Sequence, residues 1–223
     1  MQDQEIIKWN ITESKRRIRQ EIKADNLIMF FTRVAEDLRK YKNPNFYGRV
    51  KEIFILLYPY SNIFNTKEIF IELKKSNLIS KDGLRLDNQE VAYLKNFLKE
   101  LDEDCKLEKQ VSKNKIEVIL KKLIEKYLPN SDKLIETYIL GKLISSVGGI
   151  KKIYKMPSST IQLIGAEKAL FRHISNKKPA PKYGLIYYSE KIKKAQNKGK
   201  TARQLANKLS IALRVDYFQN FAQ

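Results

Sequence analysis

The stretch GAEKALFRHI, residues 165–174, contains the only histidine of the chain, His173, together with the cations Lys168 and Arg172. Lys168 and Arg172 are four residues apart, so in a helix both side chains emerge on one face. Glu167 beside them can orient a cation or accept a hydrogen bond from a base amino group. A single histidine rules out a multi-histidine metal site. We interpret the stretch as a charged helix face, and not as a catalytic or metal centre.

Enzymatic chemistry has little support elsewhere in the sequence. The sequence contains no glycine-rich phosphate loop and no dinucleotide-binding fingerprint. Cys105 is the only cysteine, which excludes an internal disulfide framework, and no pattern brings it near His173 as a nucleophile beside its base. We therefore predict that the protein is not an enzyme and uses neither a metal nor another cofactor.

The charge of the chain is strongly positive and unevenly distributed. Its 223 residues include 44 Lys and Arg against 25 Asp and Glu, a formal net charge of +19. Residues 151–223 hold 16 of these basic residues and 3 of the acidic ones, so the last third alone carries +13. Such an excess attracts a polyanion, either a nucleic acid or an anionic membrane surface.

Membrane insertion and secretion are not expected. No apolar run approaches the roughly 18 residues that cross a membrane. The first ten residues, MQDQEIIKWN, are too polar for a secretory signal. We therefore expect a cytoplasmic protein whose last third binds nucleic acid.

Helical periodicity predicts an all-α fold. Apolar residues recur at steps of three and four residues, which places one apolar stripe on each helix, as in a coiled coil. The stripes are Leu27-Phe31-Val34-Leu38-Tyr41, Phe46-Val50-Ile53-Leu57, Val91-Leu94-Leu98-Leu101-Cys105 and Ile116-Leu120-Leu123-Tyr127. They predict two arms, about 6–58 and 88–128, that pack as a long antiparallel coiled-coil hairpin. An ordinary globular helical bundle is the alternative.

Turn and capping signals predict the domain boundaries. Asn65 with Glu68, and Asp87 with Glu90, have the spacing of reciprocal helix capping. Gly148-Gly149 predicts a helix end. We expect a coiled-coil helical domain over 1–150, with a tip insertion at about 60–87, and a basic helical domain over 151–223.

The basic third mixes cations with tyrosines. The segment NKKPAPKYG, residues 176–184, carries Lys178 and Lys182 among its prolines. Tyr183, Tyr187 and Tyr188 follow closely and could stack on unpaired bases. Packing in the core is the alternative for each tyrosine.

Three longer strings resemble the Nop-domain ribonucleoprotein scaffolds. The strings are KMPSSTIQLIGAEKALFRHI (155–174), KPAPKYGLIYY (178–188) and GKTARQLANKLSIALRVDYF (199–218). The family includes the archaeal box C/D guide-RNA core protein, its nucleolar counterparts and a spliceosomal pre-messenger-RNA processing factor. The archaeal member is the most similar, and the resemblance covers about residues 10–218.

The resemblance implies a fold, partners and a function. Family members have a coiled coil that self-associates and a helical Nop domain that recognises a kink-turn RNA together with its small ribosomal-type binding protein. The particle directs 2′-O-methylation of RNA by a guide. An N-terminal domain recruits the methyltransferase fibrillarin in these relatives, and this sequence begins near the coiled coil. Direct fibrillarin binding is therefore expected to be absent or to depend on another chain.

The resemblance also implies which residues form the RNA–protein surface. Tyr188 stands where relatives often carry His or Gln, so stacking is kept while hydrogen bonding changes. For Arg214 an ion pair with Asp216 is an equal alternative, and for His173 packing is favoured over RNA contact. The expected binding residues are Gly165, Ala166, Glu167, Lys168, Ala169, Leu170, Phe171, Arg172, Lys178, Lys182, Tyr188, Lys200, Arg203 and Arg214.

Two other functions remain open at this point. A stand-alone basic RNA-binding protein would bind naked RNA tightly, with a steep salt dependence. A coiled-coil adaptor would dimerise without RNA.

Overall fold

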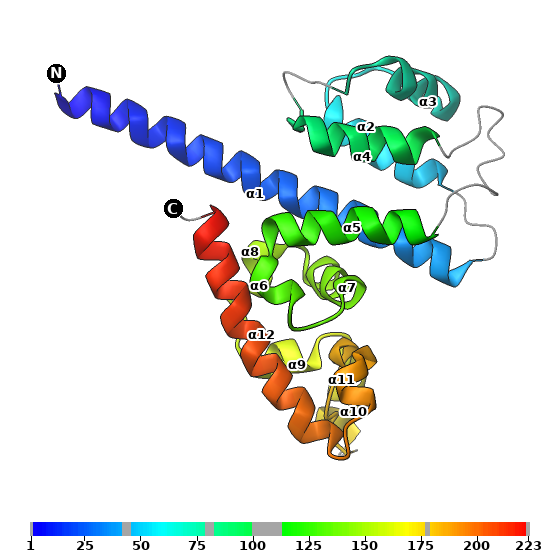
Figure 1. The fold of residues 1–223 in the computed structure, drawn as a ribbon, viewed down its shortest axis with the longest axis vertical. Helices are drawn as coiled ribbons and strands as arrows, with labels where there is room; N and C mark the ends of the chain where they lie inside the picture. Colours follow the sequence, from blue (N-terminus) through cyan, green and yellow to red (C-terminus); the bar gives the residue numbers. More distant parts are fainter. Residues whose placement is uncertain (1, 42–45, 79–82, 100–112, 177–178, 222–223) are drawn as a thin grey trace. The chain divides into compact units, whose positions relative to one another are not determined.

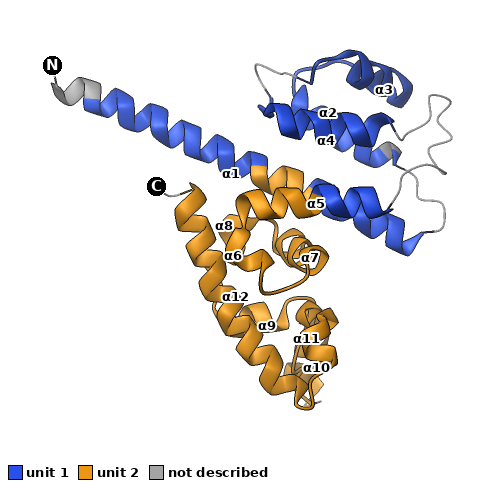
Figure 2. Cartoon of the chain, in the orientation of Figure 1, with its two compact units in different colours: residues 1–23, 30–119 blue, residues 24–29, 120–223 orange. Residues whose placement is uncertain are grey.

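The computed structural model describes residues 2–41, 46–78, 83–99, 113–176 and 179–221 (Figure 1). Within these ranges every regular element is a helix, so the predicted all-α fold is confirmed. The elements divide between two compact units, residues 1–23 with 30–119 and residues 24–29 with 120–223 (Figure 2).

Helices α1 to α4 and the start of α5 contribute to the first unit. Their bounds are α1 Gln2–Lys40, α2 Tyr47–Leu57, α3 Thr66–Lys75, α4 Asn88–Lys99 and α5 Lys113–Tyr127. Arg39, near the end of α1, donates a hydrogen bond to Glu117, near the start of α5, at 2.6 Å. The two helices run in opposite directions, as an antiparallel hairpin requires (Figure 1).

Four phenylalanines form the centre of the first unit. Phe97 of α4 meets Phe30, Phe31 and Phe46 edge to face, with ring centroids 5.5, 6.3 and 5.9 Å away. All four side chains are buried. Edge-to-face contact places the positive ring edge against the negative ring face, which adds to the free energy gained by burial.

The predicted stripes are largely buried, with one exception and one gap. Leu27, Phe31 and Val34 are buried, whereas Tyr41 is exposed. The prediction for Tyr41 was wrong because α1 ends at Lys40, so helical spacing no longer places its side chain. Leu101 and Cys105, which were predicted to continue the stripe of the second arm, lie outside the described residues.

Helix capping at the start of α4 is confirmed. The Asp87 N–H donates to Glu90 Oε2 at 2.9 Å, and the Glu90 N–H donates to Asp87 Oδ1 at 3.0 Å. Glu90 is buried and also pairs with Lys23 Nζ at 3.0 Å. At the start of α3, Asn65 accepts a hydrogen bond from the Lys67 N–H at 2.9 Å. These bonds satisfy backbone donors that a helix start leaves free.

The second unit is organised around the long helix α12. Its other elements are α6 Pro129–Asp132, α7 Thr137–Val147, α8 Ile150–Ile153, α9 Ser158–Leu163, α10 Glu167–Asn176, the 3₁₀-helix η1 Leu185–Tyr188, α11 Glu190–Lys193 and α12 Lys198–Phe221. α6, α8, α9, η1 and α11 all contact α12. Tyr154, just after α8, stacks on Tyr217 of α12 with ring centroids 3.7 Å apart.

Two glycines end α7 and begin α8, as predicted. Gly148 and Gly149 have φ angles of 84° and 130°, which side chains other than hydrogen rarely allow. A Cβ on Gly149 would lie 2.5 Å from Asp25 Oδ2. The other carboxylate oxygen of Asp25 accepts the Ile150 N–H at 2.7 Å, so the glycine allows a carboxylate to cap α8.

The compact units and the predicted domains divide the chain differently. Residues 120–150, which were predicted to belong to the coiled-coil domain, lie in the second unit. α6 packs on α12 and α7 packs on η1, which accounts for this placement. The functional division of the chain into residues 1–150 and 151–223 stays a prediction. Over the described part of the chain, no helix is both long enough and apolar enough to cross a membrane.

Candidate nucleic-acid interface

The GAEK turn, residues 165–168, is stabilised by a hydrogen bond between two of its own residues. Gly165 has a φ of 84°, and its N–H donates to Glu167 Oε1 at 2.7 Å. A Cβ on Gly165 would lie 2.5 Å from Leu185 Cγ. Gly165 is therefore needed for a left-handed turn against Leu185. Ala166 is half-buried, and its carbonyl accepts the first hydrogen bonds of α10.

Backbone pairing fixes this turn to the segment before η1. The Gly184 N–H donates to Gln162 O at 2.8 Å, and the Leu185 N–H donates to Ile164 O at 2.7 Å. Gln162 Nε2 donates to Lys182 O at 2.6 Å. The two segments lie about 20 positions apart in the sequence, so the proline-containing loop is positioned by α9.

No side chain of helix α10 is fully buried. Phe171 and Ile174 are 71% and 70% exposed. Lys168 and Arg172 are exposed, and Arg172 Nε donates to Lys168 O at 3.2 Å. Ala169 and Leu170 are half-buried. The helix therefore presents apolar and cationic groups together.

His173 lies in the last turn of α10 and is half-buried. In the described ranges no group of three His, Cys, Asp or Glu side chains could hold a metal ion. Packing of His173 stays the preferred interpretation.

The tyrosines of the loop and η1 divide into two kinds. Tyr183 and Tyr187 stack on each other with centroids 4.6 Å apart, and Lys198 Nζ lies 5.6 Å from the Tyr187 ring centroid. Contacts within the protein therefore occupy part of the surface of these two rings. Tyr188 is 59% exposed and meets Tyr187 only edge to face. Tyr188 is therefore the tyrosine most open to a base.

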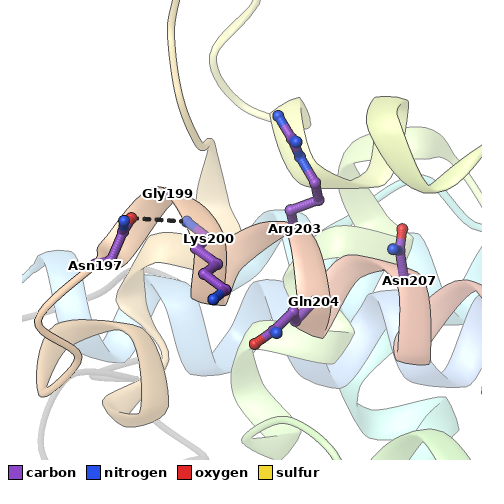
Figure 3. Close-up of a pocket in the computed structure, with 6 residues that line it drawn as sticks. All are labelled: Asn197, Gly199, Lys200, Arg203, Gln204 and Asn207. Carbon is purple, nitrogen blue, oxygen red and sulfur yellow. Dashed lines mark hydrogen bonds between the residues drawn. The ribbon is translucent and has the colours of Figure 1, made fainter.

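The start of α12 carries a basic hollow of about 440 Å³ (Figure 3). Its lining consists of two cations, three carboxamides and a glycine. The lining residues are Asn197, Gly199, Lys200, Arg203, Gln204 and Asn207. Asn197 Oδ1 accepts the Lys200 N–H at 3.0 Å and so caps the helix. Figure 3 shows Arg203 and Asn207 pointing to one side of α12, and Lys200 and Gln204 to the other.

The predicted site residues fall into two groups. Gly165 to Arg172 lie on the GAEK turn and α10, while Lys200 and Arg203 line the hollow. Lys182 is adjacent to the hollow, because its Cδ would lie 3.8 Å from a Cβ on Gly199. Lys178 lies outside the described residues.

Arg214 lies on the side of α12 that carries Arg203, three turns farther along, which is about 16 Å. Its Nε donates to Tyr154 O at 3.4 Å. The alternative ion pair of Arg214 with Asp216 is not formed, because Asp216 is buried and binds Asn130 and Ser131 instead.

Sequence reasoning missed the carboxamides of the hollow. Gln204 lies one turn after Lys200 and Asn207 one turn after Arg203, since each pair is four residues apart. That spacing was available in the sequence. The exposure of Ile174 could not be read from the sequence, because an isoleucine at helical spacing is usually buried.

Comparisons with known proteins identify the family to which the chain belongs. A family model described as "Nop: snoRNA binding domain, fibrillarin" matches residues 32–223. Nucleolar protein 56 of Schizosaccharomyces pombe is 48% identical over 94 residues, which are 41% of this chain and 19% of that protein. Nucleolar protein 58 of Neurospora crassa is 43% identical over 97 residues, which are 43% of this chain and 16% of that protein. The chain thus spans less than a fifth of the length of either relative.

Solved structures also resemble the chain, and one example covers most of it. It is a crystal structure of a fibrillarin/Nop5p complex, with a TM-score of 0.48 and 20% identity over 97% of this chain and 71% of that chain.

Proposed function

Because the chain belongs to the Nop family, we propose that it is a non-enzymatic RNA-binding scaffold of a box C/D-type guide ribonucleoprotein. In this proposal it recognises a kink-turn RNA together with the small protein bound to it. It thereby supports guide-directed 2′-O-methylation of RNA. The methyl transfer itself belongs to another subunit.

The observation that carries this proposal is the exposure of α10. No side chain of α10 is fully buried, so the helix gains little stability from packing, and isolated helices of this length are marginal in water. Phe171 and Ile174 supply apolar surface of the kind found at the centre of protein–protein contacts. Lys168 and Arg172 supply charge for phosphates. A composite of protein and RNA satisfies both kinds of group, whereas naked RNA satisfies only the cations.

Fibrillarin belongs among the proposed partners. The description of the matching family names it, so the expectation that fibrillarin binding is absent or indirect has no support.

Self-association and a cytoplasmic location in an archaeal-type cell are further parts of the proposal. The segment between α2 and α3 supports self-association, because Tyr60 and Phe64 are 83% and 73% exposed. Aromatic groups of this kind are common at interfaces. Light scattering at several concentrations would test it, and Tyr60→Ser with Phe64→Ser should then lower the measured mass to that of a monomer.

The central test is capture by the small kink-turn protein with and without its RNA. Lys168→Glu with Arg172→Glu should abolish capture by the complex, because both cations become repulsive to phosphate. Phe171→Ser with Ile174→Ser should weaken it by about tenfold or more through lost apolar contact. Lys51→Glu with Lys67→Glu, two exposed positions of the first unit, make the same change in net charge and should leave capture intact.

Two results would contradict the proposal. Unchanged capture by the Lys168 and Arg172 variant would remove α10 from the interface. Equally tight binding of naked RNA, with no gain from the small protein, would favour a stand-alone RNA-binding protein. Circular dichroism of each variant checks that its helix content is kept.

A further inference from the structure

Four of the exposed isoleucines in the first half of α1 point in one direction. Ile7, Ile11, Ile18 and Ile22 are between 48% and 56% exposed. Ile7 to Ile18 and Ile11 to Ile22 are both steps of 11 residues, which is close to three helical turns. The four side chains therefore form one straight stripe, which we call the isoleucine stripe.

The isoleucine stripe points away from Phe31 and Val34, by which α1 packs within the first unit. Phe31 and Val34 are completely buried. At 3.6 residues per turn, Ile18 and Val34 point about 160° apart. In the first half of α1, the positions that share the direction of Phe31 are occupied by the polar residues Glu13 and Gln20. The stripe is therefore an apolar face separate from the one that contains Phe31 and Val34.

Cations follow one side of the isoleucine stripe. Lys8, Lys15 and Arg19 are exposed and are spaced by seven and four residues, which places them in one row. Among the described residues none of the three forms an ion pair. Glu13, the carboxylate nearest to Lys15 in the sequence, lies on the opposite side of the helix and is bound to Arg16 at 2.6 Å. The row therefore repels itself unless a partner supplies anions.

We propose that this face of α1 binds an acidic amphipathic helix of another polypeptide. The isoleucine stripe would pack against the apolar side of that helix, as in other helix-to-helix recognition. Glu or Asp residues beside its apolar side would pair with Lys8, Lys15 and Arg19. An RNA strand could neutralise the cations, but it would leave the isoleucines without a partner. The proposal goes beyond the proposed function, which uses α10 and α12.

A second copy of the chain fits this face less well. The spacing is symmetric about residues 14 and 15, so two stripes could pair antiparallel, with Ile11 opposite Ile18. A two-fold axis brings the same flank of both helices together. Lys15 would then lie beside Lys15 of the copy, and Lys8 beside Arg19. Like charges across an interface are costly, so charge complementarity selects an acidic partner.

The test uses the full chain and two labelled synthetic peptides of about 20 residues, a length that matches the stripe. One peptide has a leucine stripe flanked by Glu, and the other carries Lys at the same flanking positions. Fluorescence anisotropy should show the acidic peptide binding at least about tenfold more tightly than the basic one. Ile11→Asp with Ile18→Asp should abolish this binding. Trp9→Ala, which removes an exposed apolar side chain from the opposite side of α1, should leave it unchanged.

The Ile11→Asp and Ile18→Asp variant could lose helix content, so a second variant with reversed charges provides an independent test. Lys15→Glu with Arg19→Glu should bind the basic peptide in preference to the acidic one. Equal binding of both peptides, or no binding of the acidic peptide at micromolar concentration, would overturn the proposal. Dimerisation of the chain that is lost in the Ile11 and Ile18 variant would assign the face to a second copy instead. Displacement of the acidic peptide from the unaltered chain by an RNA oligonucleotide would assign the face to RNA instead.

Discussion

The hydroxyl of Ser131 donates a hydrogen bond to the buried carboxylate of Asp216 at 2.6 Å. The same carboxylate accepts the Ser131 N–H at 2.9 Å and the Asn130 N–H at 2.9 Å. Asp216 thus caps the short helix α6 from the far end of α12. A carboxylate at a helix start is stabilised by the free N–H groups and by the helix dipole.

Replacing Asp216 should destabilise the second unit. In Asp216→Asn one oxygen becomes an NH₂ group, which would face donors that it cannot bind. Leaving buried donors unsatisfied costs about 1–3 kcal/mol for each group. We expect the free energy of unfolding to fall by about 2–4 kcal/mol in a urea titration. Gln219→Ala removes an exposed partner of Asn130 and should change it by less than about 0.5 kcal/mol. An unchanged midpoint for Asp216→Asn would contradict this role.

Gly165 should tolerate a methyl group much less well than Gly48. Gly165→Ala places a Cβ 2.5 Å from Leu185 Cγ at a φ of 84°. Such strain costs about 1–3 kcal/mol. A Cβ on Gly48 in α2 would have no heavy atom within 4 Å among the described residues, so Gly48→Ala should stabilise the helix by about 0.5–1 kcal/mol. Thermal unfolding of both variants compares them directly. A Gly165→Ala variant as stable as Gly48→Ala would mean that the turn is not constrained.

Much of the fold follows from apolar spacing alone. The stripe Ile116, Leu120, Leu123 and Tyr127 is buried as predicted, because α5 is continuous over all four positions. The isoleucine stripe of α1 has equally regular spacing but is exposed. Periodicity gives the direction in which side chains point, whereas burial depends on which elements lie opposite. Distant segments decide that, and single-sequence spacing does not contain it.

The candidate site was predictable in its cations and not in its turn. Lys168 and Arg172 at i and i+4 had to share a face once a helix formed. The need for glycine at position 165 depends on Leu185, which is 20 positions away in the sequence and is brought close by backbone pairing. The use of Asp216 to cap α6 was likewise invisible, because the nearby Arg214 offered an obvious local partner.

The carboxyl group of Glu13 should titrate well below its usual range. Hydrogen bonds from Arg16 and then Arg17 lower the pKa of Glu13 from 4.5 to about 2. Because the folded pKa is depressed, the helix gains stability from this group above pH 4.5 and loses it as the pH falls through about 2. Arg16→Gln with Arg17→Gln should return the pKa toward 4.5, which an NMR titration of the carboxyl carbon would show. The same change at Lys15 and Arg19, which do not bind Glu13, should leave the pKa low.

Two variants of the hollow at the start of α12 should separate the electrostatic contribution to RNA affinity from the hydrogen-bonding contribution. If Lys200 and Arg203 each neutralise one phosphate, replacing both by alanine removes two released counterions. A plot of log affinity against log salt should then become shallower by about 1.4–1.8. Gln204→Ala with Asn207→Ala should lower the affinity without changing this slope, because carboxamides carry no charge.

The salt titration needs a control for net charge, since any lost cation weakens long-range attraction to RNA. Lys51→Ala with Lys67→Ala lowers the net charge equally in the first unit and should leave the slope unchanged. If the slope falls by the same amount in the Lys200 and Arg203 variant and in the Lys51 and Lys67 control, the hollow attracts RNA only through the overall charge. A slope that stays constant for Lys200 and Arg203 would remove these two residues from the phosphate contacts, because counterion release is proportional to the number of phosphates neutralised.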